Sequence, residues 1–168
     1  MIKNKTIEKK NRKVHDSNDR NVCLRQPDHL KTILLIADEE NTQTKKLAEK
    51  TFPSSRVHHL FTRKSKEDGS KGFNYSVHTS DFGITGKLKN EHLLHLEKMP
   101  FDLVIDLSSD IEQLNYFLLR TPANLILGRN NSTNNHLHDL IFDYKQNDQN
   151  FLEYIREKLT LLTKNGNN

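Results

Sequence analysis

The stretch FDLVIDLSSD, residues 101–110, decides the fold class of this chain. Its centre is a short apolar run over residues 103–107, Leu-Val-Ile-Asp-Leu, interrupted only by Asp106. A run of this kind is typical of a strand that is covered on both faces, as the strands of parallel sheets are. The stretch therefore predicts a buried central strand.

The flanks of this strand predict a helix directly after it. Pro100 ends the preceding segment, because a proline disfavours helical backbone in the residue before it. Ser109 and Glu112 have the spacing of a capping box in which the serine is the N-cap. A strand, a tight turn and a helix make up half of a βαβ unit. The apolar positions of the helix recur at helical spacing, at Ile111, Leu114, Phe117 and Leu118.

The rest of the chain continues this alternation of strands and helices. No helix fits before the last strand, which we therefore expect to be antiparallel or at a sheet edge. The pattern predicts a three-layer, Rossmann-like α/β domain over residues 31–163, with a mostly parallel sheet of five or six strands. Residues 164–168 are expected to be a disordered tail. The other predicted strands cover residues 32–37, 56–62, 73–77, 123–127 and 137–144, and the other helices 42–50, 90–98 and 151–162.

Positive charge is concentrated at the N-terminus. The chain has 168 residues, which suits one domain with tails, and only 33% of them are hydrophobic, so part of the sequence is expected outside the core. Residues 1–31 carry nine lysines and arginines and four acidic residues, a net charge of +5, whereas the remainder carries −1. We expect residues 1–30 to form a basic N-terminal arm.

Basic arms of this kind contact nucleic acid or an anionic membrane surface, or are simply solvated. We expect RNA or a ribonucleoprotein as the partner, with Lys9, Lys10, Arg12 and Lys13 as contact residues. The arm has no aromatic side chain that could stack on bases, so it would contact phosphates, which gives affinity without sequence choice. A protein or another anionic partner is the alternative.

The sequence contains no targeting or metal motif. Residues 1–19 lack the apolar segment of a signal peptide, and no apolar run is long enough to span a membrane, which predicts a cytoplasmic protein. The single Cys23 can form neither an internal disulfide nor a thiolate zinc site. His58 and His59 are adjacent in a strand, so they point to opposite faces. We therefore expect no metal and no cofactor.

The carboxyl ends of the predicted strands bring together a second set of candidate residues. In open parallel sheets, ligands bind beyond these ends. Asp38, Asp106, Ser108 and Arg129 should lie there, and such carboxylate, hydroxyl and guanidinium groups could hold a ribose, a metal or a phosphate. The alternative is structural: strand termination and helix capping for the polar groups, and an ion pair with Asp106 or Asp110 for Arg129.

The most distinctive loop is DFGITGK, residues 81–87. Its first three residues match the metal-binding tripeptide of kinases, but the accompanying glycine-rich strand and catalytic loop are absent. Its last five residues are too few for a phosphate-binding P-loop, and Leu88 stands where that loop needs Ser or Thr. We expect its glycines to permit positive φ in a tight turn; alternatively, an exposed Phe82 and Lys87 form a contact surface. The candidate residues of the loop are Asp81, Phe82, Gly83, Gly86 and Lys87.

Four stretches carry a resemblance to a known family: the basic arm, the 81–87 loop before a short helix, Pro100-Phe101-Asp102-Leu103, and Asp139-Leu140-Ile141-Phe142. With them, the chain resembles a small, uncharacterised family of Bacteroidota proteins, a domain of unknown function, over nearly its whole length. This resemblance implies no activity. More distantly, residues 101–109 followed by 125–129 are similar to the N-terminal Rossmann-like half of heptosyltransferase-type glycosyltransferases, which need a second such domain to bind their nucleotide sugar.

Two functional hypotheses follow. The first is a non-enzymatic accessory or interaction domain whose basic arm contacts RNA, a ribonucleoprotein or another anionic partner. The second, implied by the glycosyltransferase resemblance, is a nucleotide- or sugar-phosphate-binding domain that uses the carboxyl edge of the sheet, although 168 residues leave no room for a second domain. No paired carboxylates or activated nucleophile stand out, so no catalytic residues are predicted. Whether a reaction is catalysed, and the oligomeric state, stay open.

Overall fold

Six parallel strands form the sheet of this protein. The computed structural model describes residues 2–15, 21–67, 70–130, 134–144 and 147–165. The strands follow the order β3-β2-β1-β4-β5-β6, and all neighbouring strands are parallel, as in a Rossmann-like sheet. The predicted α/β class is confirmed. The strands are β1 (Thr32–Ala37), β2 (Arg56–Thr62), β3 (Asn74–Val77), β4 (Leu103–Asp106), β5 (Ile126–Arg129) and β6 (Leu140–Phe142).

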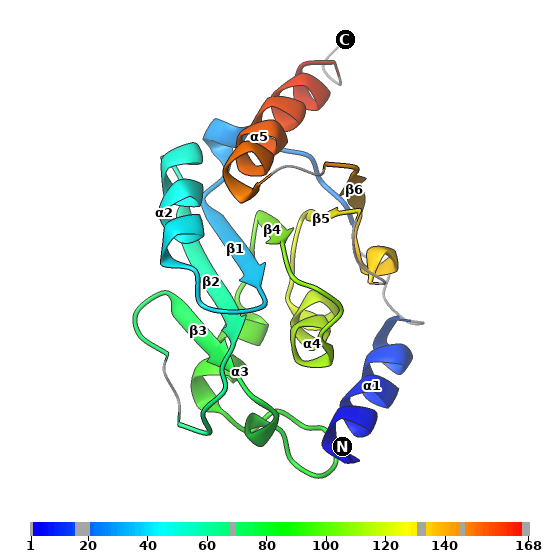
Figure 1. The fold of residues 1–168 in the computed structure, drawn as a ribbon. Coiled ribbons are helices and arrows are strands. Elements are labelled where there is room, and N and C mark those ends of the chain that lie inside the picture. Colours follow the sequence, from blue (N-terminus) through cyan, green and yellow to red (C-terminus); the bar gives the residue numbers. More distant parts are fainter. Residues whose placement is uncertain (1, 16–20, 68–69, 131–133, 145–146, 166–168) are drawn as a thin grey trace.

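Helices cover both faces of the sheet and complete the three layers (Figure 1). One face packs against α2 and α5, and the other against α1, α3 and α4. Three short 3-10 helices stand in the connections: η1 (Pro27–His29), η2 (Thr79–Asp81) and η3 (Asn135–Leu137). The α-helices are α1 (Ile2–His15), α2 (Thr42–Thr51), α3 (Glu91–Lys98), α4 (Glu112–Arg120) and α5 (Asp148–Asn165).

Each face of the sheet buries its own core, because successive side chains of a strand point to opposite faces. In β4, Val104 faces the core under α1, α3 and α4, which we call the α4-side core. Its neighbours Leu103 and Ile105 face the core under α2 and α5, the α5-side core. All three are at most 1% exposed. The central apolar run is thus a strand buried on both faces, as predicted.

Most predicted boundaries are confirmed, and the exceptions lie in the later strands. β1 and β2 coincide with their predicted ranges, and the side chains of Asn41 and Asn90 cap α2 and α3. β5 begins at Ile126 rather than at residue 123. β6 pairs with β5 in parallel and lies at the sheet edge, so the predicted edge position is confirmed and the antiparallel alternative is wrong. The short η3 makes the crossover that would otherwise need a full helix.

The predicted capping box of α4 is wrong. α4 begins at Glu112, its N-cap is Ile111, and no side chain caps it. Ser109 is bonded elsewhere: its backbone N–H and its hydroxyl donate to the two carboxylate oxygens of Asp38, at 2.7 and 2.9 Å. Asp38, which follows the neighbouring strand β1, therefore binds Ser109, the residue that the local spacing predicted as the N-cap of α4.

Both ends of the chain contain more helix than predicted. α5 continues to Asn165, past the start of the predicted tail, and residues 166–168 lie outside the described residues. The segment expected to be a basic arm contains α1, and Ile7 of this helix is fully buried in the α4-side core. Within the described ranges, no helix is long and apolar enough to span a bilayer.

Candidate nucleic-acid interface

α1 is held against α4 by both apolar and polar contacts. Ile7 is fully buried and Asn11 is 5% exposed. The Asn11 amide donates to the backbone oxygen and to the carboxylate of Glu112, both at 3.1 Å, and its oxygen accepts from Arg120 at 2.7 Å. A helix of this length with so few apolar residues is marginal alone, so these tertiary contacts fix its position.

The turn of the 81–87 loop packs against the N-terminal half of α1. Gly86 has a φ of +70°, and a Cβ on it would lie 3.2 Å from the backbone carbonyl of Thr6. Its N–H donates to the Gly83 oxygen at 2.9 Å and closes the turn. The expected positive φ is therefore confirmed for Gly86 and wrong for Gly83. A side chain at Gly86 would push α1 away from the domain.

The outward side of α1 is basic. Of the predicted nucleic-acid contacts, Lys9, Arg12 and Lys13 are exposed and Lys10 is partly buried. Lys5 is a fourth exposed cation, and we call Lys5, Lys9, Arg12 and Lys13 the α1 basic face. Residues four apart on a helix lie about 6 Å from each other, so the three lysines form a stripe along the helix axis.

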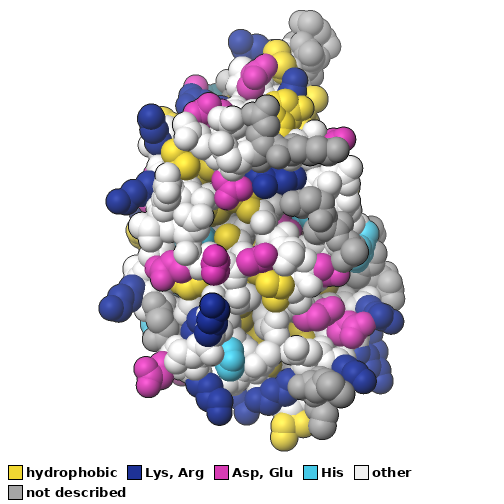
Figure 2. All heavy atoms as spheres, viewed as in Figure 1, with side chains coloured by type: hydrophobic (Ala, Val, Ile, Leu, Met, Phe, Trp, Pro, Cys, Tyr) yellow, Lys and Arg dark blue, Asp and Glu magenta, His cyan; other side chains and the backbone are white. Residues whose placement is uncertain are grey.

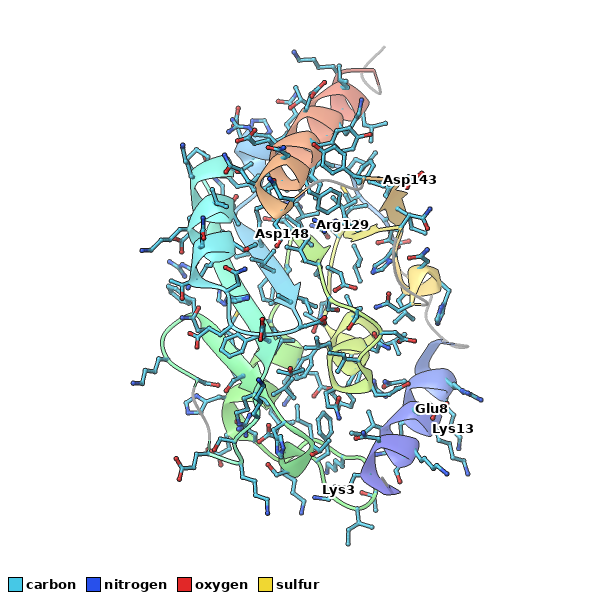
Figure 3. The ribbon with its side chains drawn as sticks, viewed as in Figure 1. Lys3, Glu8, Lys13, Arg129, Asp143 and Asp148 are labelled. Atoms are coloured by element: carbon cyan, nitrogen blue, oxygen red, sulfur yellow. The ribbon has the colours of Figure 1, made fainter. Side chains whose placement is uncertain are left out.

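One acidic residue lies on the helix that carries this face. Glu8 is the one acidic residue of α1, and it pairs with Arg12 at 2.6 Å in an exposed ion pair, a weak kind of interaction. Figure 3 shows Lys3, Glu8 and Lys13 along the helix. In Figure 2, lysine and arginine side chains gather at the lower right, over α1. Exposed Lys87 follows the turn that touches the helix and extends the positive surface.

Asp81 of the 81–87 loop is bonded within the protein. Its carboxylate accepts two hydrogen bonds from the Arg63 guanidinium, at 2.7 and 2.8 Å, and both side chains are less than a tenth exposed. It also accepts from the backbone N–H of His78 at 2.8 Å and from the Asn90 amide at 3.3 Å. These bonds tie the loop to β2, β3 and the start of α3.

The predicted exposure of Phe82 is wrong. Its ring is fully buried and meets the ring of Tyr116 edge to face, with centroids 5.1 Å apart. At the turn that follows, Ile84 is 77% exposed and Lys87 is exposed as expected. The loop is thus anchored by its first residues and open to solvent at its turn.

Asp106 is the centre of a buried polar cluster at the end of β4. Its carboxylate lies 2.8 Å from Nε2 of His138, and each of these side chains is 1% exposed. The carboxylate accepts from the N–H and hydroxyl of Ser108 at 2.9 and 2.5 Å, and from the Asn134 amide at 3.2 Å. A Cβ on Gly128 would lie 2.3 Å from the His138 ring, so this ring packs directly on β5.

Arg129 is also bonded within the protein. Its guanidinium donates to Asp148, the first residue of α5, at 2.8 Å and lies 4.5 Å from the centroid of the Phe151 ring (Figure 3). The predicted structural partners, Asp106 and Asp110, are wrong, because the first turn of α5 supplies a closer carboxylate.

The four carboxyl-edge candidates therefore meet at one edge of the sheet, each with a protein partner. Asp38 bonds to Ser109, and Asp106 holds Ser108. A ligand that used these groups would have to displace those bonds or add to them. Their role in binding a nucleotide or sugar phosphate stays a prediction.

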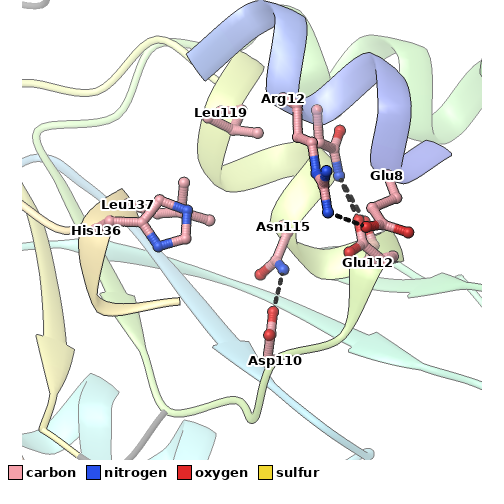
Figure 4. A pocket seen from close by; sticks show the side chains of 9 residues that line it. Glu8, Arg12, Asp110, Glu112, Asn115, Leu119, His136 and Leu137 are labelled. Carbon is pink, nitrogen blue, oxygen red and sulfur yellow. Dashed lines mark hydrogen bonds and ion pairs between the residues drawn. The ribbon is translucent and has the colours of Figure 1, made fainter. Parts of the chain in front are cut away.

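A pocket of about 360 Å³ lies between α1, α4 and η3 (Figure 4). Three carboxylates line it, from Glu8, Asp110 and Glu112, against the single guanidinium of Arg12. Burial is the main cause that raises the pKa of Glu112, and the nearby carboxylates add to the effect. The negative charge of this pocket disfavours a phosphate. In the part of the chain that the structure describes, no group of three His, Cys, Asp or Glu side chains could hold a metal ion.

Sequence reasoning missed the side chains that bind the candidate residues. Arg63, Asp148, Asn134 and His138 lie 18, 19, 28 and 32 residues from their respective partners. No local spacing rule connects residues so far apart. The polarity of Asn134 and His138, both close to the expected carboxyl edge, is the one signal that could have brought them into the site.

Comparisons with known proteins identify a family but no activity. Neither the curated proteins nor the solved structures gave a significant match. The model of a family of unknown function, DUF6913, matches residues 3–164. The match includes nearly all of α1, and the expected membership of an uncharacterised family is confirmed. The chain belongs to this family of unknown function, DUF6913.

Proposed function

We propose that this protein is a non-enzymatic, cytoplasmic accessory domain that binds RNA, alone or in a ribonucleoprotein, through the α1 basic face. One observation carries the proposal: a helix fixed to the domain by Ile7 and Asn11 presents four exposed cations to solvent. Held on a rigid helix, these cations lose less entropy on binding than they would on a free arm.

Phosphates are the groups this face fits best. Binding a phosphate strand releases condensed counterions, so several lysines in a row give affinity that depends steeply on salt. The face has no aromatic residue, which favours contacts to the backbone rather than to bases. The apolar side of α1 faces the α4-side core and is not available to enter a membrane surface.

The second candidate is binding of a nucleotide or sugar phosphate at the carboxyl edge, by Asp38, Asp106, Ser108 and Arg129. The order of the strands favours it, because ligands of such sheets bind where the order reverses, between β1 and β4. The bonds already made by each of the four side chains count against it. We therefore rank it below the α1 basic face.

The decisive experiment measures RNA affinity of surface variants by fluorescence anisotropy, with a single-stranded 20-mer and a salt series. Deleting residues 1–30 is a poor test, because it removes Ile7 from the core. The triple variant Lys5→Ala/Lys9→Ala/Lys13→Ala keeps the fold, since all three side chains are exposed and alanine favours helix. The salt slope should fall by about 2, which is about 0.7 for each lost phosphate contact.

A matched control separates this site from general charge effects. Lys46→Ala, Lys50→Ala and Lys164→Ala remove the same charge from exposed positions of α2 and α5, on the other face of the sheet. We expect this triple variant to bind nearly as the wild type does. Equal losses in the two triple variants, or no loss in the α1 variant, would refute the proposal.

A further inference from the structure

A groove of about 680 Å³ opens at the amino ends of β1, β4 and β5, on the edge of the sheet opposite to the ligand edge predicted from sequence. It is lined by the segment that precedes β1 and by the turns that precede β4 and β5. We call it the amino-end groove. Its polar lining includes Arg25, Lys31, Arg120, Thr121 and Asn124.

The amino-end groove carries excess positive charge. Asp102, the one carboxylate among the described lining residues, accepts from Arg25 at 2.7 Å, from the Lys31 backbone N–H at 2.7 Å and from Asn124 at 3.2 Å. Among the described residues, neither the Lys31 ammonium nor the Arg120 guanidinium is bonded to a carboxylate. Within the described lining, three cations therefore stand against one carboxylate.

One further feature of the lining suits a nucleotide. Pro100, Pro122 and Ala123 add an apolar wall. A phosphate beside the cations and a base or ribose against this wall would satisfy both kinds of lining, and the volume is that of a small-ligand site.

Arg120 connects the amino-end groove to α1. Arg120 lines the groove, and its Nη1 donates at 2.7 Å to Asn11, the neighbour in sequence of Arg12. Arg120 therefore lies beside the C-terminal half of α1, the helix that carries the basic face.

We propose that the amino-end groove binds one nucleotide of the RNA strand that crosses the α1 basic face, with Lys31 and Arg120 on its phosphate. This inference rests on the proposed function of α1. It identifies the ligand as single-stranded RNA, because a nucleotide can enter the groove only when its base is unpaired.

The test combines crosslinking with a charge reversal. A 4-thiouridine-labelled 20-mer is irradiated with the full-length protein, and tryptic peptides are mapped. Cleavage after Arg120 and Arg129 isolates residues 121–129, which contain Thr121 and two residues of the apolar wall, Pro122 and Ala123. We expect crosslinks in this peptide as well as in α1. Lys31→Glu should abolish the 121–129 crosslink and weaken binding about five- to tenfold at 50 mM salt.

The control is Lys64→Glu, the same charge reversal at an exposed lysine beyond the carboxyl end of β2, at the opposite edge of the sheet. If Lys31→Glu behaves like Lys64→Glu while the α1 triple variant loses affinity, the groove proposal fails and the proposed function stands. If only Lys31→Glu loses affinity, the groove binds RNA and the proposed function of α1 fails. If neither Lys31→Glu nor the α1 triple variant loses affinity, both the groove proposal and the proposed function fail.

A competition experiment distinguishes binding of a nucleotide within an RNA strand from binding of a free nucleotide. Uridine monophosphate at millimolar concentration should leave the 121–129 crosslink in place, because a strand held by several contacts competes well with a single unit. Loss of this crosslink with unchanged RNA affinity would show that the groove is a site for free nucleotides and would overturn the proposal.

Discussion

Replacing Ile7 by alanine tests the step on which both proposals rest, the docking of α1. Ile7 is fully buried in the α4-side core, together with Phe82 and Leu88 of the neighbouring loop. Truncating a buried isoleucine to alanine costs about 2–5 kcal/mol, and the lower half of this range is expected here because an end helix can partly collapse into the space or detach. For a chain of this size, the melting temperature should fall by about 5–10 °C.

Chemical denaturation followed by circular dichroism gives the free energy of unfolding, and hydrogen exchange shows whether the α1 amides lose protection. Ile84→Ala is the matched control, because it deletes the same atoms from a side chain that is 77% exposed. We expect this control to change stability by less than about 0.5 kcal/mol. Equal effects of the two substitutions would show that α1 is not docked, and the α1 basic face would then be a flexible arm.

Three further predictions concern the interior and the carboxyl edge. Gly128→Ala should destabilise the fold by about 1–3 kcal/mol in urea denaturation, because the added methyl would lie 2.3 Å from the buried His138 ring; a neutral effect would contradict this packing. Arg129→Ala should cost about 1–3 kcal/mol, since it leaves the α5 carboxylate without its charged donor, and an unchanged melting temperature would show that the pair is absent in solution. Burial lowers the pKa of His58 and of His59 to about 4. Unfolded histidines titrate near pH 6.5, so the unfolded state binds more protons below this pH, and stability should fall between pH 6.5 and 4 by up to about 1.4 kcal/mol per pH unit for each histidine. Denaturation at pH 7, 6 and 5 measures this slope, and a flat profile would refute it.

The sheet was predictable because its strands are buried on both faces. The apolar runs of β1, β2 and β4 have the length of strands, and Pro100, Asn41 and Asn90 mark the neighbouring boundaries. Such local signals need no knowledge of the partner element. Where the outcome depended on a competing partner, as for Ser109 and Asp38, the local rule gave the wrong helix start.

The place of α1 could not be predicted in the same way. Its sequence has three apolar residues, Ile2, Ile7 and Val14, which are too far apart in a polar stretch to give a clear amphipathic pattern. The helix is positioned by Asn11, whose three partners belong to Glu112 and Arg120, about a hundred residues later. Side-chain amides make such contacts anywhere in a chain, so the sequence identified the charge of this segment but not its attachment.

The candidate site was predictable only in part. Strand polarity correctly places Asp38, Asp106, Ser108 and Arg129 at one edge, since parallel strands all end there. It does not indicate that each side chain finds a protein partner, because those partners come from loops and from α5. The burial of the Phe82 ring could not be predicted either, because a single aromatic residue between Asp81 and Gly83 in the sequence forms no periodic apolar pattern.

The distribution of charge is the reason that we propose α1 and the amino-end groove, rather than the carboxyl edge, as the RNA-binding surface. Between β1 and β4 the Asp38 carboxylate already bridges to Ser109, and exposed Glu39 and Glu40 follow it. Acidic side chains cross the middle of the face shown in Figure 2, while basic ones gather over α1. Two like charges 4 Å apart repel by about 1 kcal/mol in water and by about 4 kcal/mol near a protein surface. If the proposed function is correct, a phosphate strand should therefore be repelled from the carboxyl edge and attracted to the basic side of the protein.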